Sequence, residues 1–339
     1  MKKDISSSKI LYIGIGISLV LTGLIWFFAP ALSRIELLPD TGFLWYYWKL
    51  PEPDFWARIS SWSLYIIHQV LAWVIIYKAF TADRTVKKVL SKWNWAMLIV
   101  NLVFIILHLI QTHLFYDGLA QDTPIWASQG SVIVMLVLIL IIENPRRGMF
   151  FGKKAPLPKF SISLVRKYHG FFIAWALVYT FWYHPAEGTI GHLMGFFYMF
   201  LLFLQMSLMY TRSHMNKYWT FSLEVFVLVH GAIVAVMNAN GIWPMFAFGF
   251  GAIAVVTQIY GLGLKRWQLI GITLAYIALV LVVYTPLTVP SRSIVDTQEI
   301  IRIPVIEYAL VFIFAYLLAV PRLFLKNQES SQKNPGESG

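Results

Sequence analysis

The feature that most constrains this chain is a succession of ten segments that are each long and apolar enough to cross a lipid bilayer. A spanning helix needs about 20 predominantly apolar residues. Inside the hydrocarbon only helices and closed barrels satisfy every backbone hydrogen bond. The sequence therefore predicts an all-α, polytopic integral membrane helix bundle with about ten transmembrane helices. The expected spans are 10–30, 58–80, 93–116, 125–143, 168–184, 190–212, 219–240, 243–264, 267–286 and 304–321.

These spans predict a single transmembrane domain over residues 1–326. The chain is 58% hydrophobic and 13% charged, whereas a soluble domain has about 25% charged residues, so a soluble globular protein is excluded. The C-terminal residues 327–339 have few apolar side chains and cannot bury enough surface to fold. We therefore expect them to form a disordered cytoplasmic tail.

The distribution of charge predicts how the bundle is oriented. The formal net charge is +11, and most of the 27 Lys and Arg residues fall in alternate loops, above all in 145–167. Loops rich in Lys and Arg stay on the cytoplasmic side of a membrane. Both termini are then cytoplasmic, and the expected location is the plasma (cytoplasmic) membrane. Because topology explains the basic balance, the expected partner is the lipid bilayer and not nucleic acid.

Three histidines are expected at one depth near the outer face. His113 ends the third span, His184 ends the fifth and His192 opens the sixth. The link between the last two is short, which makes their helices antiparallel neighbours. Glu187 lies in this link, and Asp117 follows the third span. Imidazoles with carboxylates suit a divalent transition metal, so these five residues are the expected metal site. The same groups can also transfer protons.

Two further histidines are expected near the middle of the bilayer, His68 in the second span and His230 in the seventh. A haem b held by two histidines needs both imidazoles at one depth on facing helices, and this pair meets the condition of depth. His169 lies about four turns before His184 on one helix. Such spacing favours a second haem level, so His68, His230 and His169 are the expected cofactor-binding residues.

These patterns leave three classes of function open. The first is a membrane oxidoreductase or metal-dependent enzyme with haem b or a divalent metal in a histidine-rich site near the outer face. The second is a proton-coupled secondary transporter with a small-molecule or ion ligand, because ten spans can form two inverted sets of five. The third is a non-catalytic assembly or sensor protein, in which histidines join helices by hydrogen bonds. The chain has no cysteine, which excludes disulfides, zinc–thiolate sites and cysteine catalysis.

Overall fold

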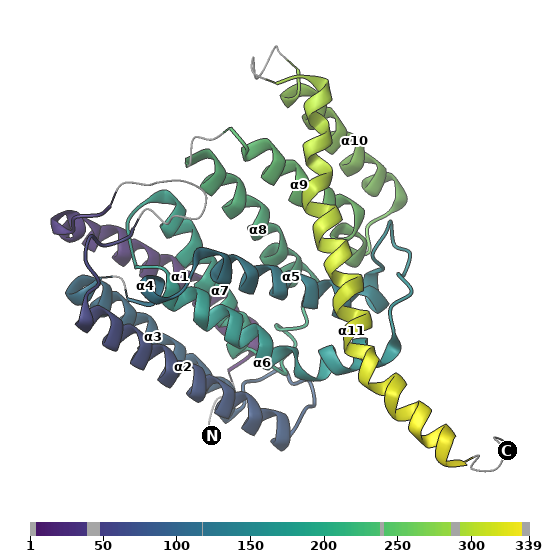
Figure 1. Cartoon of the computed structure of the whole chain (residues 1–339), viewed down its shortest axis with the longest axis horizontal. Coiled ribbons are helices and arrows are strands. Elements are labelled where there is room, and N and C mark those ends of the chain that lie inside the picture. Colours follow the sequence, from purple (N-terminus) through teal and green to yellow (C-terminus); the bar gives the residue numbers. More distant parts are fainter. Residues whose placement is uncertain (1–4, 39–47, 117, 238–240, 286–291, 334–339) are drawn as a thin grey trace. The chain divides into compact units, whose positions relative to one another are not determined.

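The computed structural model describes residues 5–38, 48–116, 118–237, 241–285 and 292–333, with side chains up to Arg322, and its secondary structure elements there are helices (Figure 1). Within these ranges no β-strand is formed. The α-helices are α1 (Ser7–Phe28), α2 (Phe55–Ala82), α3 (Lys92–Phe115), α4 (Leu119–Asp122), α5 (Ile125–Arg147), α6 (Lys159–Tyr183), α7 (Ile190–Ser207), α8 (Lys217–Met237), α9 (Trp243–Val256), α10 (Arg266–Val283) and α11 (Arg302–Lys333). The 3-10 helices are η1 (Ala29–Arg34), η2 (Gln258–Leu262) and η3 (Ile294–Ile301).

Eight stretches of helix in the described part of the chain are long and apolar enough to cross a membrane, which fits a multi-pass membrane protein. They contain α1, α2, α3, α5, α7, α8, α10 and α11. Two of the ten expected spans are not among them. The helix α9 has 14 residues, about 21 Å, because the expected span 243–264 is broken by η2. The helix α6 is long, but Lys159, Arg166 and Lys167 make its first part polar.

Side-chain caps decide where several of these helices begin. An Asp, Ser or Thr before the first turn accepts a hydrogen bond from a backbone N–H of that turn, which stabilises a helix by about 1 kcal/mol. The residues that do so are Ser6 for α1, Asp54 for α2, Ser91 for α3 and Thr189 for α7. The sequence thus sets the start of the helices that surround the site described below.

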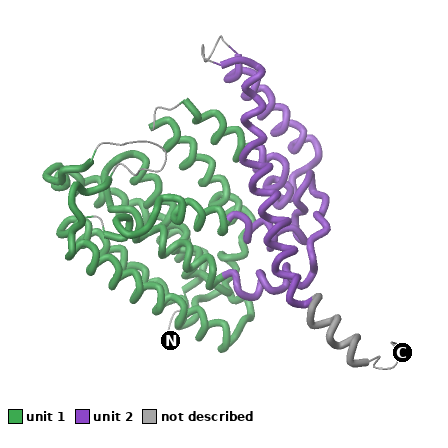
Figure 2. Tube along the Cα trace, in the orientation of Figure 1, with its two compact units in different colours: residues 1–135, 170–251 green, residues 136–169, 252–339 purple. Residues whose placement is uncertain are grey.

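The chain divides into two compact units (Figure 2), and the single transmembrane domain expected over 1–326 stays a prediction. Unit 1 comprises residues 1–135 and 170–251, and unit 2 comprises residues 136–169 and 252–339. The helix α11 continues to Lys333, so residues 327–333, which were expected to belong to a disordered tail, are helical. Residues 334–339 lie outside the described part.

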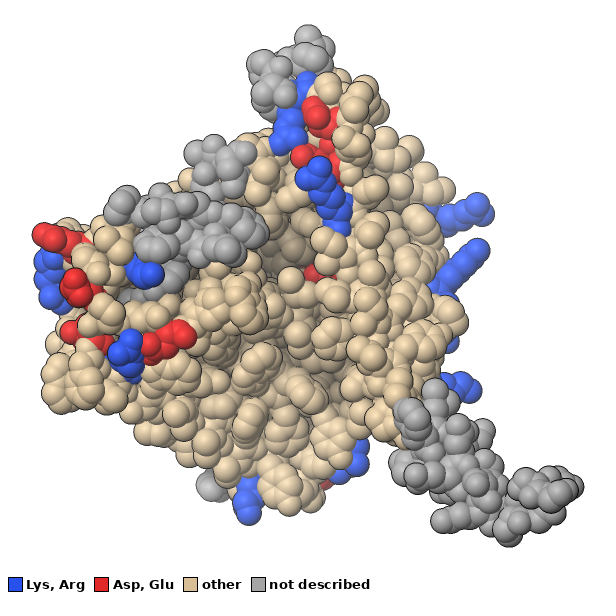
Figure 3. All heavy atoms as spheres, in the orientation of Figure 1, with Lys and Arg blue, Asp and Glu red and all other residues tan. Residues whose placement is uncertain are grey.

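In unit 1, α2 packs on α3, and α7 packs on α1, α3 and α8. The largest buried side chains of its core include Phe181, Phe196, Phe203, Met97 and Tyr183. Many large apolar side chains remain exposed on the helices, and much of the surface visible in Figure 3 carries no charged side chain. Exposed apolar surface of this extent is unusual for a soluble monomer and suits contact with lipid.

In unit 2, hydrogen bonds join α11 to distant segments. Ser161 donates its hydroxyl to the carbonyl oxygen of Ala315. A tight turn after α5 has Gly148 at φ 76°, and a Cβ there would lie 2.4 Å from the backbone of Gly152, so only glycine fits. The helix α10 buries none of its residues, which leaves its apolar side chains for lipid.

Candidate functional site

One face of α3 carries a line of buried polar side chains, which we call the α3 line: Asn94, Asn101, His108, Gln111 and Thr112. The first three follow one another at intervals of about two helical turns, which keeps them on one face. Each of the five side chains is at most 3% exposed. From its first to its last member the line extends about 27 Å along the helix, close to the roughly 30 Å thickness of a bilayer core.

Asn94 fixes the beginning of α3 against the end of α7. Its amide Nδ2 donates to the carbonyl oxygens of Ser207 at 2.7 Å and Met209 at 2.9 Å. Its Oδ1 accepts from the backbone N–H and the hydroxyl of Ser91, both at 2.8 Å. All hydrogen-bonding atoms of this amide are therefore engaged.

The middle of the α3 line is a closed network around His68. The Nε2 of this ring donates to Oδ1 of Asn101 at 3.1 Å, and its Nδ1 accepts from Nε1 of Trp182 at 3.3 Å. Asn101 in turn donates from Nδ2 to the hydroxyl of Ser207 at 3.0 Å and to the carbonyl oxygen of Phe203 at 3.3 Å. The partners assign these tautomers. Because both nitrogens of His68 are occupied, the ring has no lone pair left for haem iron in this structure.

His108 differs from His68 because only one of its nitrogens has a partner. Its Nε2 lies 2.8 Å from the carbonyl oxygen of His184, so it must donate. The Nδ1 atom then carries a lone pair, and it is buried without a hydrogen-bond partner among the residues that the structure describes. The rings of Phe181 and Trp182 pack against it at 4.5 and 4.6 Å between centroids. His108 thus presents an unused basic nitrogen inside unit 1.

A cluster of polar and aromatic side chains lies beyond His108. The rings of His184 and His192 are 5.8 Å apart, and the ring of Trp48 lies 5.1 Å from each. Glu187 lies 3.6 Å from Nδ1 of His192 and accepts a hydrogen bond from the hydroxyl of Tyr116. The short link between α6 and α7 therefore brings its histidines and its carboxylate together. The backbone of Tyr116 at φ 64° is a conformation that non-glycine residues rarely adopt.

His113 faces a different environment from the cluster. Its Nδ1 lies 2.7 Å from the carbonyl oxygen of Leu109, and its Nε2 lies 3.2 Å from that of Phe28. Two carbonyl acceptors leave no nitrogen free to ligate a metal while both bonds are formed. Asp117, the fifth expected ligand, lies outside the described residues. No group of three or more His, Asp or Glu suited to a metal ion is formed within the described ranges.

The remaining expected haem ligands are also held by backbone carbonyls. His230 of α8 donates from Nε2 to the carbonyl oxygen of Gly191 at 3.3 Å. His169 donates from Nδ1 to Arg166 at 2.8 Å, and it belongs to unit 2 rather than unit 1. No hydrogen bond or ring contact joins His68 to His230 among the described residues. The pairing of these two histidines across a haem stays a prediction.

The histidines of unit 1 form a different arrangement, a connected series through its interior. Trp182 donates to Nδ1 of His68 and packs against the ring of His108 at 4.6 Å. His108 donates to the carbonyl oxygen of His184, whose ring lies 5.8 Å from that of His192. Depth in the expected spans groups the other histidines but does not include His108 in either expected site. The recurrence of Asn94, Asn101 and His108 on one helical face was the signal that identifies the α3 line.

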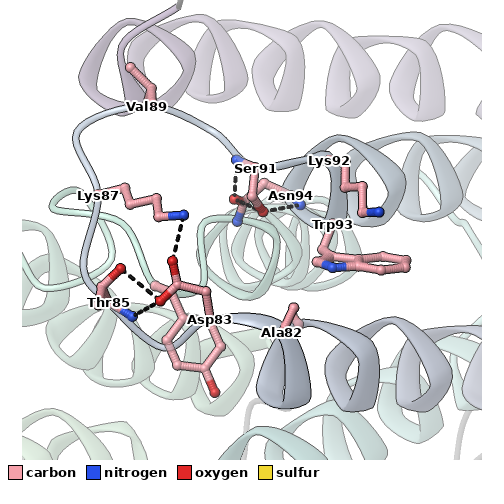
Figure 4. A pocket seen from close by; sticks show the side chains of 11 residues that line it. Ala82, Asp83, Thr85, Lys87, Val89, Ser91, Lys92, Trp93 and Asn94 are labelled. Atoms are coloured by element: carbon pink, nitrogen blue, oxygen red, sulfur yellow. Dashed lines mark hydrogen bonds and ion pairs between the residues drawn. The ribbon is translucent and has the colours of Figure 1, made fainter.

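A cavity of about 190 Å³ lies beside the Asn94 end of the α3 line (Figure 4). Asp83, Thr85, Lys87 and Asn94 are among the residues that line it. Lys87 lies 2.7 Å from Asp83, and Thr85 donates to the same carboxylate from its backbone and hydroxyl. These contacts, that with Lys87 first, hold the pKa of Asp83 well below its usual value. The volume is enough for several water molecules, which occupy about 30 Å³ each.

No protein-family model, curated protein sequence or solved structure matches this chain. Its chemical capacity is therefore inferred from the side chains themselves. Imidazoles and carboxylates in hydrogen-bonding surroundings can pass protons, and in membranes the same groups join helices to one another.

Proposed function

We propose that the chain is a proton-coupled membrane transporter in which protons move along the α3 line of unit 1. The observation that carries this proposal is that buried polar side chains follow one another through unit 1 and that further polar groups lie at both ends of this path. The path starts at the cavity beside Asn94 and continues through the series from His68 to His184. It ends at the pair of Glu187 and His192. In the expected topology the Asn94 end faces the cytoplasm, as do both termini.

The tautomers support a path of this kind. A neutral imidazole donates from one nitrogen and accepts at the other, so it can take up a proton on one side and release one on the other. His108 donates from Nε2 and keeps Nδ1 as an acceptor, whereas His184 donates from Nδ1 to Thr180 at 2.9 Å. No described hydrogen bond joins the two rings directly. Transfer between them therefore requires a bridging water molecule or a rotation of one ring.

A haem- or metal-dependent enzyme, which the sequence also predicts, is supported less well by this geometry. His68 and His113 use both nitrogens in hydrogen bonds. Of the five expected metal ligands, the cluster brings together three, which are His184, His192 and Glu187. The third class, a non-catalytic protein, requires only that the α3 line hold helices together.

Proton flux in proteoliposomes tests the proposal. The full chain is reconstituted with an internal pH-sensitive dye, and flux is driven by a membrane potential, by a pH gradient and by gradients of sugars, amino acids and inorganic ions. The variant His108→Gln keeps a donor for the carbonyl of His184 but cannot relay a proton. We expect it to lower the flux at least about tenfold, since a positioned proton-transfer group contributes that much or more.

The matched control is His214→Gln. His214 lies in the turn between α7 and α8, where its Nδ1 bonds the carbonyl oxygen of Gln205 at 2.9 Å, and it is not a member of the α3 line. Its flux should equal that of the natural chain. Absence of flux under every driving gradient, or equal flux in the His108 variant, would overturn the proposal.

A further inference from the structure

Unit 2 contains a buried carboxyl group with no partner. Glu307 lies in the first turns of α11 and is 3% exposed. Its Oε2 is fully buried, and the carboxyl group makes no hydrogen bond or ion pair with any residue that the structure describes. Two other buried Glu side chains have partners: Glu187 accepts a hydrogen bond from Tyr116, and Glu299 pairs with Arg292.

The charged and titratable neighbours do not neutralise this carboxyl group. Tyr308, the next residue of α11, interacts electrostatically with Glu307 and with Arg147 of α5. No hydrogen bond or ion pair joins Arg147 to Glu307 among the described residues. On the same turn of α5, Glu143 and Arg146 pair with each other. Tyr308 also makes two contacts with uncharged side chains.

Those uncharged contacts are the ring of Phe150, 4.8 Å away, and the hydroxyl of Thr257, 2.7 Å from the phenol oxygen. Thr257 also donates to the carbonyl oxygen of Met149. These contacts of the neighbouring residue bring no charged group to Glu307. Among the described residues, no ion pair gives its carboxyl group a counter-ion.

A negative charge in such a position is costly, because neither water nor a counter-ion stabilises it. Intramembrane acidic groups commonly pair, face water or bind a proton. We propose that Glu307 is a proton-binding site of unit 2 and carries its proton at neutral pH. This site lies wholly within unit 2 and shares no residue with the α3 line, so it stands or falls independently of proton movement in unit 1.

Infrared spectroscopy of the purified full chain in lipid tests this directly. A protonated carboxyl group has a C=O stretching band that is separate from carboxylate bands and shifts in D₂O. In the difference spectrum between the natural chain and Glu307→Gln at neutral pH, we expect one such band to be lost. The control Glu143→Gln removes an ion-paired, more exposed carboxylate and should change carboxylate bands alone. Loss of carboxylate bands on replacing Glu307 would overturn the proposal.

A chemical label on the natural chain covers the case in which Glu307→Gln does not fold. A hydrophobic carbodiimide reacts with a protonated carboxyl group: the O–H adds across one C=N bond, and the O-acylisourea rearranges to a stable N-acylurea with no group leaving. Peptide mass spectrometry should place this adduct on Glu307 at neutral pH and not on Glu143, with labelling that declines as the pH is raised. Labelling of Glu143 without Glu307 would contradict the assignment.

Discussion

The two units bury polar side chains in opposite ways. In unit 1, Asn94 and Asn101 reach partners on other helices, and the hydrogen bonds of one continue into those of the next. In unit 2, Glu307 is equally buried and has no partner among the residues that the structure describes. A satisfied buried group holds a structure together, whereas an unsatisfied one is costly unless it changes its charge or finds a ligand. The satisfied amides of Asn94 and Asn101 therefore hold the helices of unit 1 together around the proposed proton path, whereas Glu307 is the group expected to change its charge.

The largest expected effect comes from breaking the network of unit 1 at Asn101. Replacement by leucine preserves the volume but leaves the Nε2 of His68 and the hydroxyl of Ser207 without their partner. We expect Asn101→Leu to lower the free energy of unfolding by about 2–3 kcal/mol, measured by reversible unfolding in mixed micelles. Val103→Leu, on an exposed part of the same helix, should change it far less. Equal effects of the two changes would mean that the network does not stabilise unit 1.

A smaller effect is expected in the part of unit 2 that does have partners. Thr257→Val keeps the shape of the side chain and removes the hydroxyl that bonds Met149 and Tyr308. The loss should be about 1 kcal/mol, seen as a lower midpoint in the same unfolding measurement. A change as large as that of Asn101→Leu would show that unit 2 depends on its hydrogen bonds as strongly as unit 1.

The exposed ion pair of Asp83 with Lys87 is expected to stabilise the fold less than the buried hydrogen bonds of either unit. The lowered pKa of Asp83 means that its ionised form stabilises the fold. This contribution is present above the carboxyl pKa of the unfolded chain and disappears as the pH falls through the folded value. Asp83→Asn should therefore lower the thermal midpoint slightly at neutral pH and not in strong acid. Because the pair is exposed, high salt should also remove the difference. A difference that persists in acid would contradict this account.

The smallest effect is expected from Glu307→Gln. The amide has the shape of the neutral acid and loses no described hydrogen bond, so stability in acid, below the carboxyl pKa of the unfolded chain, should be nearly unchanged. Above that pKa, unfolding of the natural chain releases the proton of Glu307, so the variant should become the more stable one as the pH rises. Thermal unfolding of both chains across pH checks this. A large loss at neutral pH would reveal a partner for this carboxyl group.

Much of the architecture follows from local properties of the sequence. Runs of apolar residues and caps such as Ser91 and Thr189 are sufficient to locate most helices, because a bilayer permits little besides helix. The break inside the expected span 243–264 depends instead on the 3-10 turn at Gln258–Leu262, whose residues are as apolar as those of a helix. Apolarity alone does not distinguish the two conformations.

The candidate site was less predictable, because depth does not determine which way a side chain faces. His113 and His184 were placed at one level, yet His113 bonds the carbonyl of Phe28 at the end of α1. The proximity of His184 to His192 was predictable from the short link between their helices. The isolation of Glu307 was not, since it depends on packing by segments distant in sequence.

The spacing of the α3 line also determines which helix each member meets. Seven residues fall about 20° short of two full turns of an ideal α-helix, so successive members are rotated slightly around the axis. Asn94 accordingly meets the end of α7, Asn101 meets both α2 and α7, and His108 meets the chain just after α6. This slow rotation lets successive members of the α3 line meet different neighbours. A small rotation of α3 about its own axis would therefore change the polar partners of all three residues together.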